Sequence, residues 1–172
     1  MSHKSTYATP FRRRKEQKTN YKKRLALLKS KQLRLVVRKS NNNLIAEVVE
    51  YFKAGDKTRV FVHSNELKDF GWTRHAGNIP AAYLTGYLCG KKAVKEKIES
   101  AILDMGLNTP VHGSRIFAGL KGAIDGGLKI KADEKVFPSG ERIRGGHISP
   151  ESEKNFQETL ENINKKFGEK NE

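Results

Sequence analysis

Cysteine is almost absent from this chain, since Cys89 is the only one among 172 residues. A single cysteine excludes an internal disulfide, a cysteine-rich zinc site and a paired-cysteine redox motif, and it is typical of a reducing compartment. No apolar run approaches the about 18 residues that a membrane-spanning helix needs. The first residues also lack the apolar stretch of about 7–15 residues found in secretory signals, so we expect a cytosolic protein.

Acidic residues are scarce in the first quarter of the chain, where Glu16 is the only one among residues 1–40. The same segment holds 14 of the 34 lysines and arginines, and therefore most of the net charge of +15. Such charges repel one another and oppose compaction, so we expect residues 1–32 to form an extended or partly helical arm that a polyanion orders. An ordinary soluble enzyme does not carry this charge, and a nucleic-acid partner is favoured.

The composition of the arm favours RNA binding over two alternatives, a tail that is merely solvated and a segment that binds an anionic membrane. Arginines are mixed with the lysines, and a guanidinium group can hold a phosphate through two hydrogen bonds. Tyr7, Phe11 and Tyr21 are interleaved with the charges and offer faces on which unpaired bases can stack. The arm has too few apolar residues to favour burial in a membrane.

Helical spacing of apolar residues predicts a short helix late in the arm. Tyr21, Leu25 and Leu28 lie at intervals of four and three residues. We expect this narrow apolar stripe to pack against the body of the protein. The cations Lys18, Lys22 and Arg24 are then expected to face outward.

The body begins with three segments of strand composition, at residues 33–38, 44–51 and 59–63, joined by turns at 40–43 and 55–56. Alternation in the first segment places Leu35 and Val37 inward and Arg34 and Arg38 on a basic outer face. The apolar run 101–103 predicts a further strand in the same sheet, covered on both faces and entered by a helical crossover. The expected fold class is therefore α/β, with a mixed sheet built from an antiparallel meander plus a crossover.

Three longer helices are predicted around this sheet. Asn78 can cap the first, which runs to Ile98, and Gly86 and Gly90 on its surface indicate close packing on a neighbouring element. A second runs from Ser114 to the stop at residues 126–127, and a third begins at residue 149. Between them, residues 129–148 lose periodicity and predict a loop. The expected divisions are an arm at 1–32, an α/β core at 33–132, a basic loop at 133–148 and a C-terminal helix at 149–172.

A metal-dependent nuclease of ribonuclease-H-like architecture is the alternative from another functional class. Such enzymes also follow a meander with helix, strand and helix, and they hold two metal ions with paired carboxylates. The candidates are Asp104 and Asp125, supported by Glu66 or Asp69. The first strand should donate a carboxylate but carries cations, which repel metal. The nuclease is therefore the weaker alternative, and the five histidines are too dispersed to support a metal site.

Several short motifs follow one another in a specific order. They include Arg12-Arg13-Arg14-Lys15, Thr19-Asn20-Tyr21, Arg38-Lys39-Ser40-Asn41, Phe70-Gly71-Trp72, Gly77-Asn78-x-Pro80, Leu103-Asp104-x-Gly106-Leu107, Asp125-Gly126-Gly127-Leu128 and Arg142-Ile143-Arg144-Gly145. Over residues 7–148 this order resembles the family of ribosomal protein eighteen of the large subunit, in its archaeal and eukaryal branch.

The resemblance implies a fold of the translational-machinery type and a protein that catalyses nothing. It implies binding to 5S ribosomal RNA, which the family anchors to 23S ribosomal RNA and neighbouring ribosomal proteins in the central protuberance of the cytoplasmic ribosome. It implies no cofactor, no membrane contact and no obligate homo-oligomer. Carried over position by position, the candidate RNA contacts are Arg12, Arg13, Arg14, Lys15, Lys18, Thr19, Asn20, Tyr21, Lys22, Arg24, Arg38, Lys39, Ser40, Asn41, Arg142, Arg144 and His147.

Overall fold

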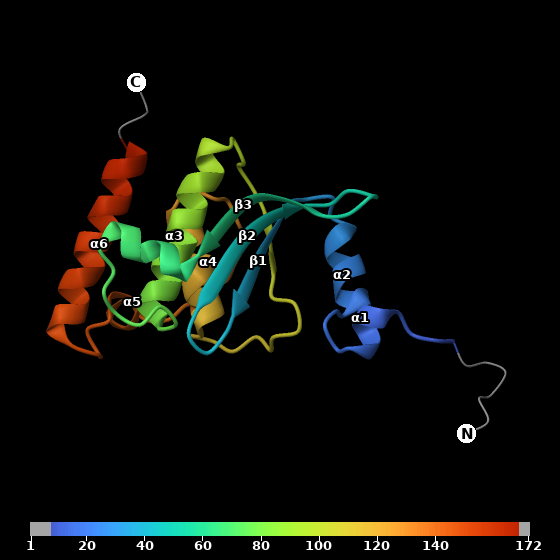
Figure 1. The fold of residues 1–172 in the computed structure, drawn as a ribbon, viewed down its shortest axis with the longest axis horizontal. Helices are drawn as coiled ribbons and strands as arrows, with labels where there is room; N and C mark the ends of the chain where they lie inside the picture. The colour runs from blue at the N-terminus through green and yellow to red at the C-terminus, as the bar shows by residue number, and fades with distance from the viewer. Residues whose placement is uncertain (1–7, 169–172) are drawn as a thin grey trace.

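The computed structural model describes residues 8–168, which form a sheet with long helices on one face and the arm on the other (Figure 1). The sheet order is β3-β2-β1-β4; β1, β2 and β3 are antiparallel neighbours, and β4 runs parallel to β1. The predicted mixed sheet of an α/β fold is thus confirmed. The strands are β1 Arg34–Lys39, β2 Leu44–Glu50, β3 Lys57–His63 and β4 Ile102–Asp104.

The helices begin close to the predicted signals. Asn78 Oδ1 accepts a hydrogen bond from the Ala81 amide at 2.8 Å and so caps α3, while Ser149 Oγ accepts one from Ser152 at 3.2 Å at the start of α6. The α-helices are α1 Arg12–Lys15, α2 Tyr21–Leu28, α3 Ile79–Lys95, α4 Arg115–Asp125, α5 Gly140–Arg144 and α6 Pro150–Gly168, with 3₁₀ helices η1 Ser64–Phe70 and η2 Glu134–Val136.

The hydrophobic core lies between the sheet and α3. Leu35 and Val37 of β1 are buried on this inner face, as predicted, and Ala46 and Val48 of β2 are buried beside them. Leu84 of α3 is buried against them in the same cluster. Helix α4 packs beside α3, and α6 covers the far side of α3 (Figure 1). This packing leaves the opposite face of the sheet to the arm.

Two local predictions were wrong. Strand β4 joins the sheet next to β1, but it is half-buried, because it forms an edge of the sheet and is not covered on both faces. The segment 129–148 is not a plain loop, because it contains η2 and α5. Both helices are shorter than the stretch over which helical periodicity can be recognised.

No helix within residues 8–168 combines the length and apolar character needed to cross a membrane.

Candidate nucleic-acid interface

A groove with a volume of about 760 Å³ lies between the arm and the outer face of the sheet. One wall is formed by residues of α1, α2 and the segment between them, and the other by β1, β2 and the chain after β4. Its lining carries seven cationic side chains and three acidic ones, so its net charge is positive. The cations are Arg13, Lys18, Lys23, Arg24, Arg34, Arg38 and Lys39, and the acids are Glu47, Asp56 and Asp104.

Polar side chains of the arm fix its two short helices relative to each other. Arg13 Nε donates to Thr19 Oγ1 at 2.9 Å, and Asn20 Oδ1 accepts from the Lys23 amide at 3.1 Å, which caps α2. The rings of Phe11 and Tyr21 lie 5.1 Å apart. Thr19 and Asn20, predicted as RNA contacts, therefore also shape the arm.

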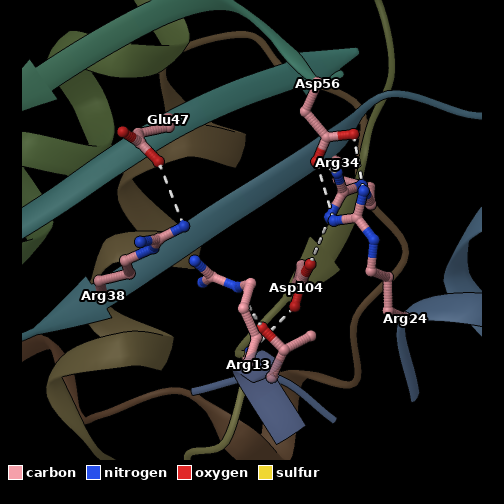
Figure 2. Close-up of polar contacts among 9 residues, drawn as sticks. Arg13, Arg24, Arg34, Arg38, Glu47, Asp56 and Asp104 are labelled. Atoms are coloured by element: carbon pink, nitrogen blue, oxygen red, sulfur yellow. Dashed lines mark hydrogen bonds and ion pairs between the residues drawn. The ribbon is translucent and has the colours of Figure 1, made fainter. Parts of the chain in front are cut away.

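An ion-pair cluster joins the arm to the sheet, and we name it the Asp56 cluster after its central member. Arg24 donates to both carboxylate oxygens of Asp56, at 2.8 and 2.7 Å. Arg34 donates to Asp56 at 2.6 Å and to Asp104 at 2.8 Å. Figure 2 shows Arg34 between the two carboxylates, with the guanidinium group of Arg24 beside it and also directed at Asp56. The cluster thus links α2, the turn between β2 and β3, β1 and β4.

The Asp56 cluster corrects two predictions about the arm and the first strand. Arg24 does not face outward, because both of its terminal nitrogens are bound to Asp56. Arg34 lies on the outer face of the sheet but is not an open cation, because its side chain is only 3% exposed. The predicted apolar stripe is also incomplete, since Leu25 is 60% exposed while Tyr21 and Leu28 are half-buried.

The hydrogen bonds within the cluster change how its members titrate. The hydrogen bonds from Arg24, together with the one from Arg34, outweigh desolvation and lower the pKa of Asp56 below its ordinary value of 3.8. The hydrogen bonds to Asp56 raise the pKa of Arg24. A lowered carboxyl pKa contributes stability above the ordinary value and loses it as the pH falls through the folded value. Asp56 is therefore ionised, and its ion pairs are complete, at neutral pH.

Other predicted contacts keep their charge open to solvent. Arg14, Lys15, Lys22 and Lys39 are exposed. Arg38 is 65% exposed, and its ion pair with Glu47 is long, at 3.8 Å. Arg12 and Lys18 share the single carboxylate of Glu16 and also remain exposed. A phosphate can reach all of these cations without breaking a buried ion pair.

Hydrogen bonds from Arg115 hold the turn at residues 40–43 in place. The sequence pattern did not single out this residue. Arg115 Nη1 donates to the carbonyl oxygens of Ser40, Asn41 and Gly77, at 2.9, 3.3 and 2.8 Å. The exposed side chains of Ser40 and Asn41 stand at the end of β1, next to Lys39. Arg115 therefore fixes the position of two predicted RNA contacts through their backbone.

We expect Arg115→Gln to lower the free energy of unfolding by about 1–3 kcal/mol, because hydrogen bonds of a charged donor are among the stronger ones. Urea unfolding followed by circular dichroism measures this change. The control is Lys121→Gln on the same helix, which removes a solvent-exposed pair with Asp125 and should cost about 0.5 kcal/mol or less. Equal unfolding midpoints for the two variants would contradict the assigned role of Arg115.

The three remaining predicted contacts do not join the groove. Arg142 and Arg144 lie on α5, which packs against α3 and α6, and His147 follows it. All three are exposed, but none lines the groove. In Figure 1, α5 lies on the helical side of the sheet and the arm on the other side. These residues form a separate basic surface.

The groove also contains residues that the sequence reasoning missed, namely Lys23, Thr58 and Asn108. Lys23 belongs to the charged run of the arm, and its position beside Lys22 was a usable signal. Asn108 follows the carboxyl end of β4, which lies beside the parallel strand β1. Polar residues that follow neighbouring parallel strands converge at one edge of a sheet, so this signal was also available.

The carboxylates considered for a nuclease are not brought together. Asp104 is bound to Arg34, Asp125 accepts from Tyr83 and Lys121, and Glu66 accepts from Lys92. Among residues 8–168, no group of three or more His, Cys, Asp or Glu side chains is placed to hold a metal ion. Burial raises the pKa of the Cys89 thiol to about 12, so this core cysteine is not a nucleophile at neutral pH.

Two comparisons with known proteins relate the chain to the same family. The family model described as ribosomal large subunit proteins 60S L5 and 50S L18 matches residues 5–101 and 95–133. The large ribosomal subunit protein uL18 of Methanothermobacter thermautotrophicus is 46% identical over 160 residues, which cover 93% of this chain and 83% of that protein. The chain therefore belongs to the family of ribosomal large subunit proteins that comprises 60S L5 and 50S L18.

Proposed function

We propose that the chain binds 5S ribosomal RNA through the arm and the outer face of the sheet, and that it anchors this RNA to 23S ribosomal RNA in the central protuberance. As a member of its family, it is a structural constituent of the large ribosomal subunit and not an enzyme, and it acts in the cytoplasmic ribosome. The observation that carries the proposal is the groove lined by seven cations between the arm and the sheet.

The chemistry of the groove favours structured RNA over duplex DNA. The exposed cations of the arm can replace counterions on phosphates. Tyr21, Asn20 and Asn108 add a ring and two amides at the same place, and these groups can contact unpaired bases and 2′-hydroxyls. We assign the candidate contacts of the arm other than Arg24, the end of β1 and the turn at 40–43 to 5S RNA. We assign the separate surface of Arg142, Arg144 and His147 to a second site of contact with RNA, outside the groove.

Binding to a labelled 5S transcript tests the proposal, with fluorescence anisotropy as the readout. If about 8 phosphates are neutralised, the logarithm of the association constant should fall with the logarithm of salt concentration with a slope of about −6 to −7. An unrelated structured RNA and a duplex DNA of equal length serve as competitors. Failure to bind the 5S transcript, or equally tight binding of all three nucleic acids, would reject the assignment.

A further inference from the structure

Asp56 is one of three acidic residues in a groove that is lined by seven cations. It lies in the turn between β2 and β3, which reaches toward α2 (Figure 1). Its carboxylate accepts two hydrogen bonds from Arg24 and one from Arg34. A carboxylate placed among phosphate-binding groups weakens the field that attracts RNA. Its position therefore calls for a role other than direct contact with RNA.

The attachment of the arm to the body depends on few contacts. Neither α1 nor α2 contains a buried residue. Among the hydrogen bonds of residues 8–168, only those between Arg24 and Asp56 join residues 8–32 to the rest of the structure. Apolar burial contributes little to this attachment, so the Arg24–Asp56 pair is its principal directional contact.

The position of Asp56 is itself fixed by a hydrogen bond from the sheet. Arg34 projects from β1, is 3% exposed, and binds Asp56 with one terminal nitrogen and Asp104 with the other. Because Asp104 belongs to β4, Arg34 is held by two fixed elements of the sheet. The turn that carries Asp56 is thereby tied to the same sheet, as Figure 2 shows. Because Asp56 is fixed relative to the sheet, its bonds to Arg24 also fix α2 relative to the sheet.

We propose that Asp56 is a positioning residue for RNA binding, which fixes α2 on the outer face of the sheet and so forms the groove before RNA arrives. This inference rests on the proposed function. Its physical basis is preorganisation: a segment that is already ordered loses less conformational entropy when it binds. Arg24 serves as the partner of Asp56 and not as a phosphate ligand.

Electrostatics and positioning predict opposite outcomes for one substitution. Asp56→Asn removes a negative charge from a cationic groove, so attraction of RNA alone predicts tighter binding. Positioning predicts weaker binding, because α2 is released and must be ordered when RNA binds. Arg34 keeps its bond to Asp104 in this variant, so the sheet retains its main internal contact. The direction of the change therefore separates the two explanations.

The experiment compares Asp56→Asn with Glu50→Gln in the full-length chain, using the labelled 5S transcript at physiological salt. Glu50 is the matched control, because it lies on β2 and its partner Arg59 belongs to β3, not to the arm. We expect Asp56→Asn to raise the Kd about tenfold, as the cost of ordering several side chains predicts, and Glu50→Gln to leave it unchanged or slightly lower. Hydrogen exchange of the amides at residues 23–28 should become faster in Asp56→Asn only.

The remaining outcomes test the positioning role of Asp56 and the proposed function separately. Equal or tighter RNA binding by Asp56→Asn overturns the positioning role. If that variant does not fold, Arg24→Gln replaces it in the exchange measurement, because it leaves the bonds of Arg34 intact; unchanged exchange in α2 then overturns the role. If the wild-type chain does not bind the 5S transcript, the proposed function fails. Exchange in α2 still reports whether Asp56 holds the arm.

Discussion

Removal of residues 1–30 is expected to abolish binding of 5S ribosomal RNA while the rest of the chain stays folded. The deletion removes most of the cations that line the groove, and with them the arm wall of the groove itself. The affinity at physiological salt should fall by about 100-fold or more, because several phosphate contacts are lost together. Anisotropy with the labelled transcript measures the loss.

The fold should survive this deletion because residues 8–30, the described part of the deleted segment, contribute nothing to the core. No residue of α1 or α2 is buried, and β1 begins only at Arg34. Arg34 keeps its hydrogen bonds to both Asp56 and Asp104 in the shortened chain. Circular dichroism and a thermal melt should therefore give a cooperative transition close to that of the full chain.

A double variant of α5 provides the matched control for the deletion. Arg142→Gln with Arg144→Gln removes exposed cations from a surface that does not line the groove. Loss of two phosphate contacts should weaken binding far less than loss of the arm, and should make the salt slope less steep by about 2 at most. If the deletion binds as tightly as the full chain, the arm is not the 5S interface.

Local chemistry explains why most of the fold could be predicted from the sequence. Alternation in β1 and β2 depends on adjacent residues, and a helix cap such as Asn78 acts on an amide three residues away. The charge of the arm is likewise a property of composition. A sheet of mixed direction, helices with the expected starts and a basic surface beside β1 therefore follow from short-range patterns.

The pairing of the charges could not be predicted in the same way. Arg24 and Arg34 meet Asp56 from positions 32 and 22 residues away, and no periodicity specifies which acid receives which arginine. Arg24 looks like any other cation of the arm until the turn of the hairpin places Asp56 beside it. For the same reason, Leu25 could be assigned to an apolar stripe although it lies in solvent. The sequence indicates how much charge the site has, whereas the fold decides which charges remain open.

Gly86→Ala is expected to destabilise the protein by about 3 kcal/mol, the upper end of the usual cost of overpacking. Helix α3 crosses α4 at glycines on both surfaces, and a Cβ atom at Gly86 would overlap the carbonyl oxygen of Gly119. The same holds for a Cβ at Gly122 against the carbonyl oxygen of Tyr83. Because these neighbours are backbone atoms, no side chain can rotate away, and the two helices must separate to admit a methyl group.

Gly140→Ala is the matched control, since a Cβ at this position in α5 meets nothing within 4 Å. Alanine is favoured over glycine in a helix interior by about 1 kcal/mol, and Gly140 is the first residue of α5, so Gly140→Ala should be neutral or slightly stabilising. The same preference acts in α3, which means that any destabilisation by Gly86→Ala has to exceed it. Urea unfolding of the two variants measures the difference directly. Equal midpoints would mean that α3 and α4 can separate at little cost, and would contradict the close contact on which the position of both helices behind the sheet depends.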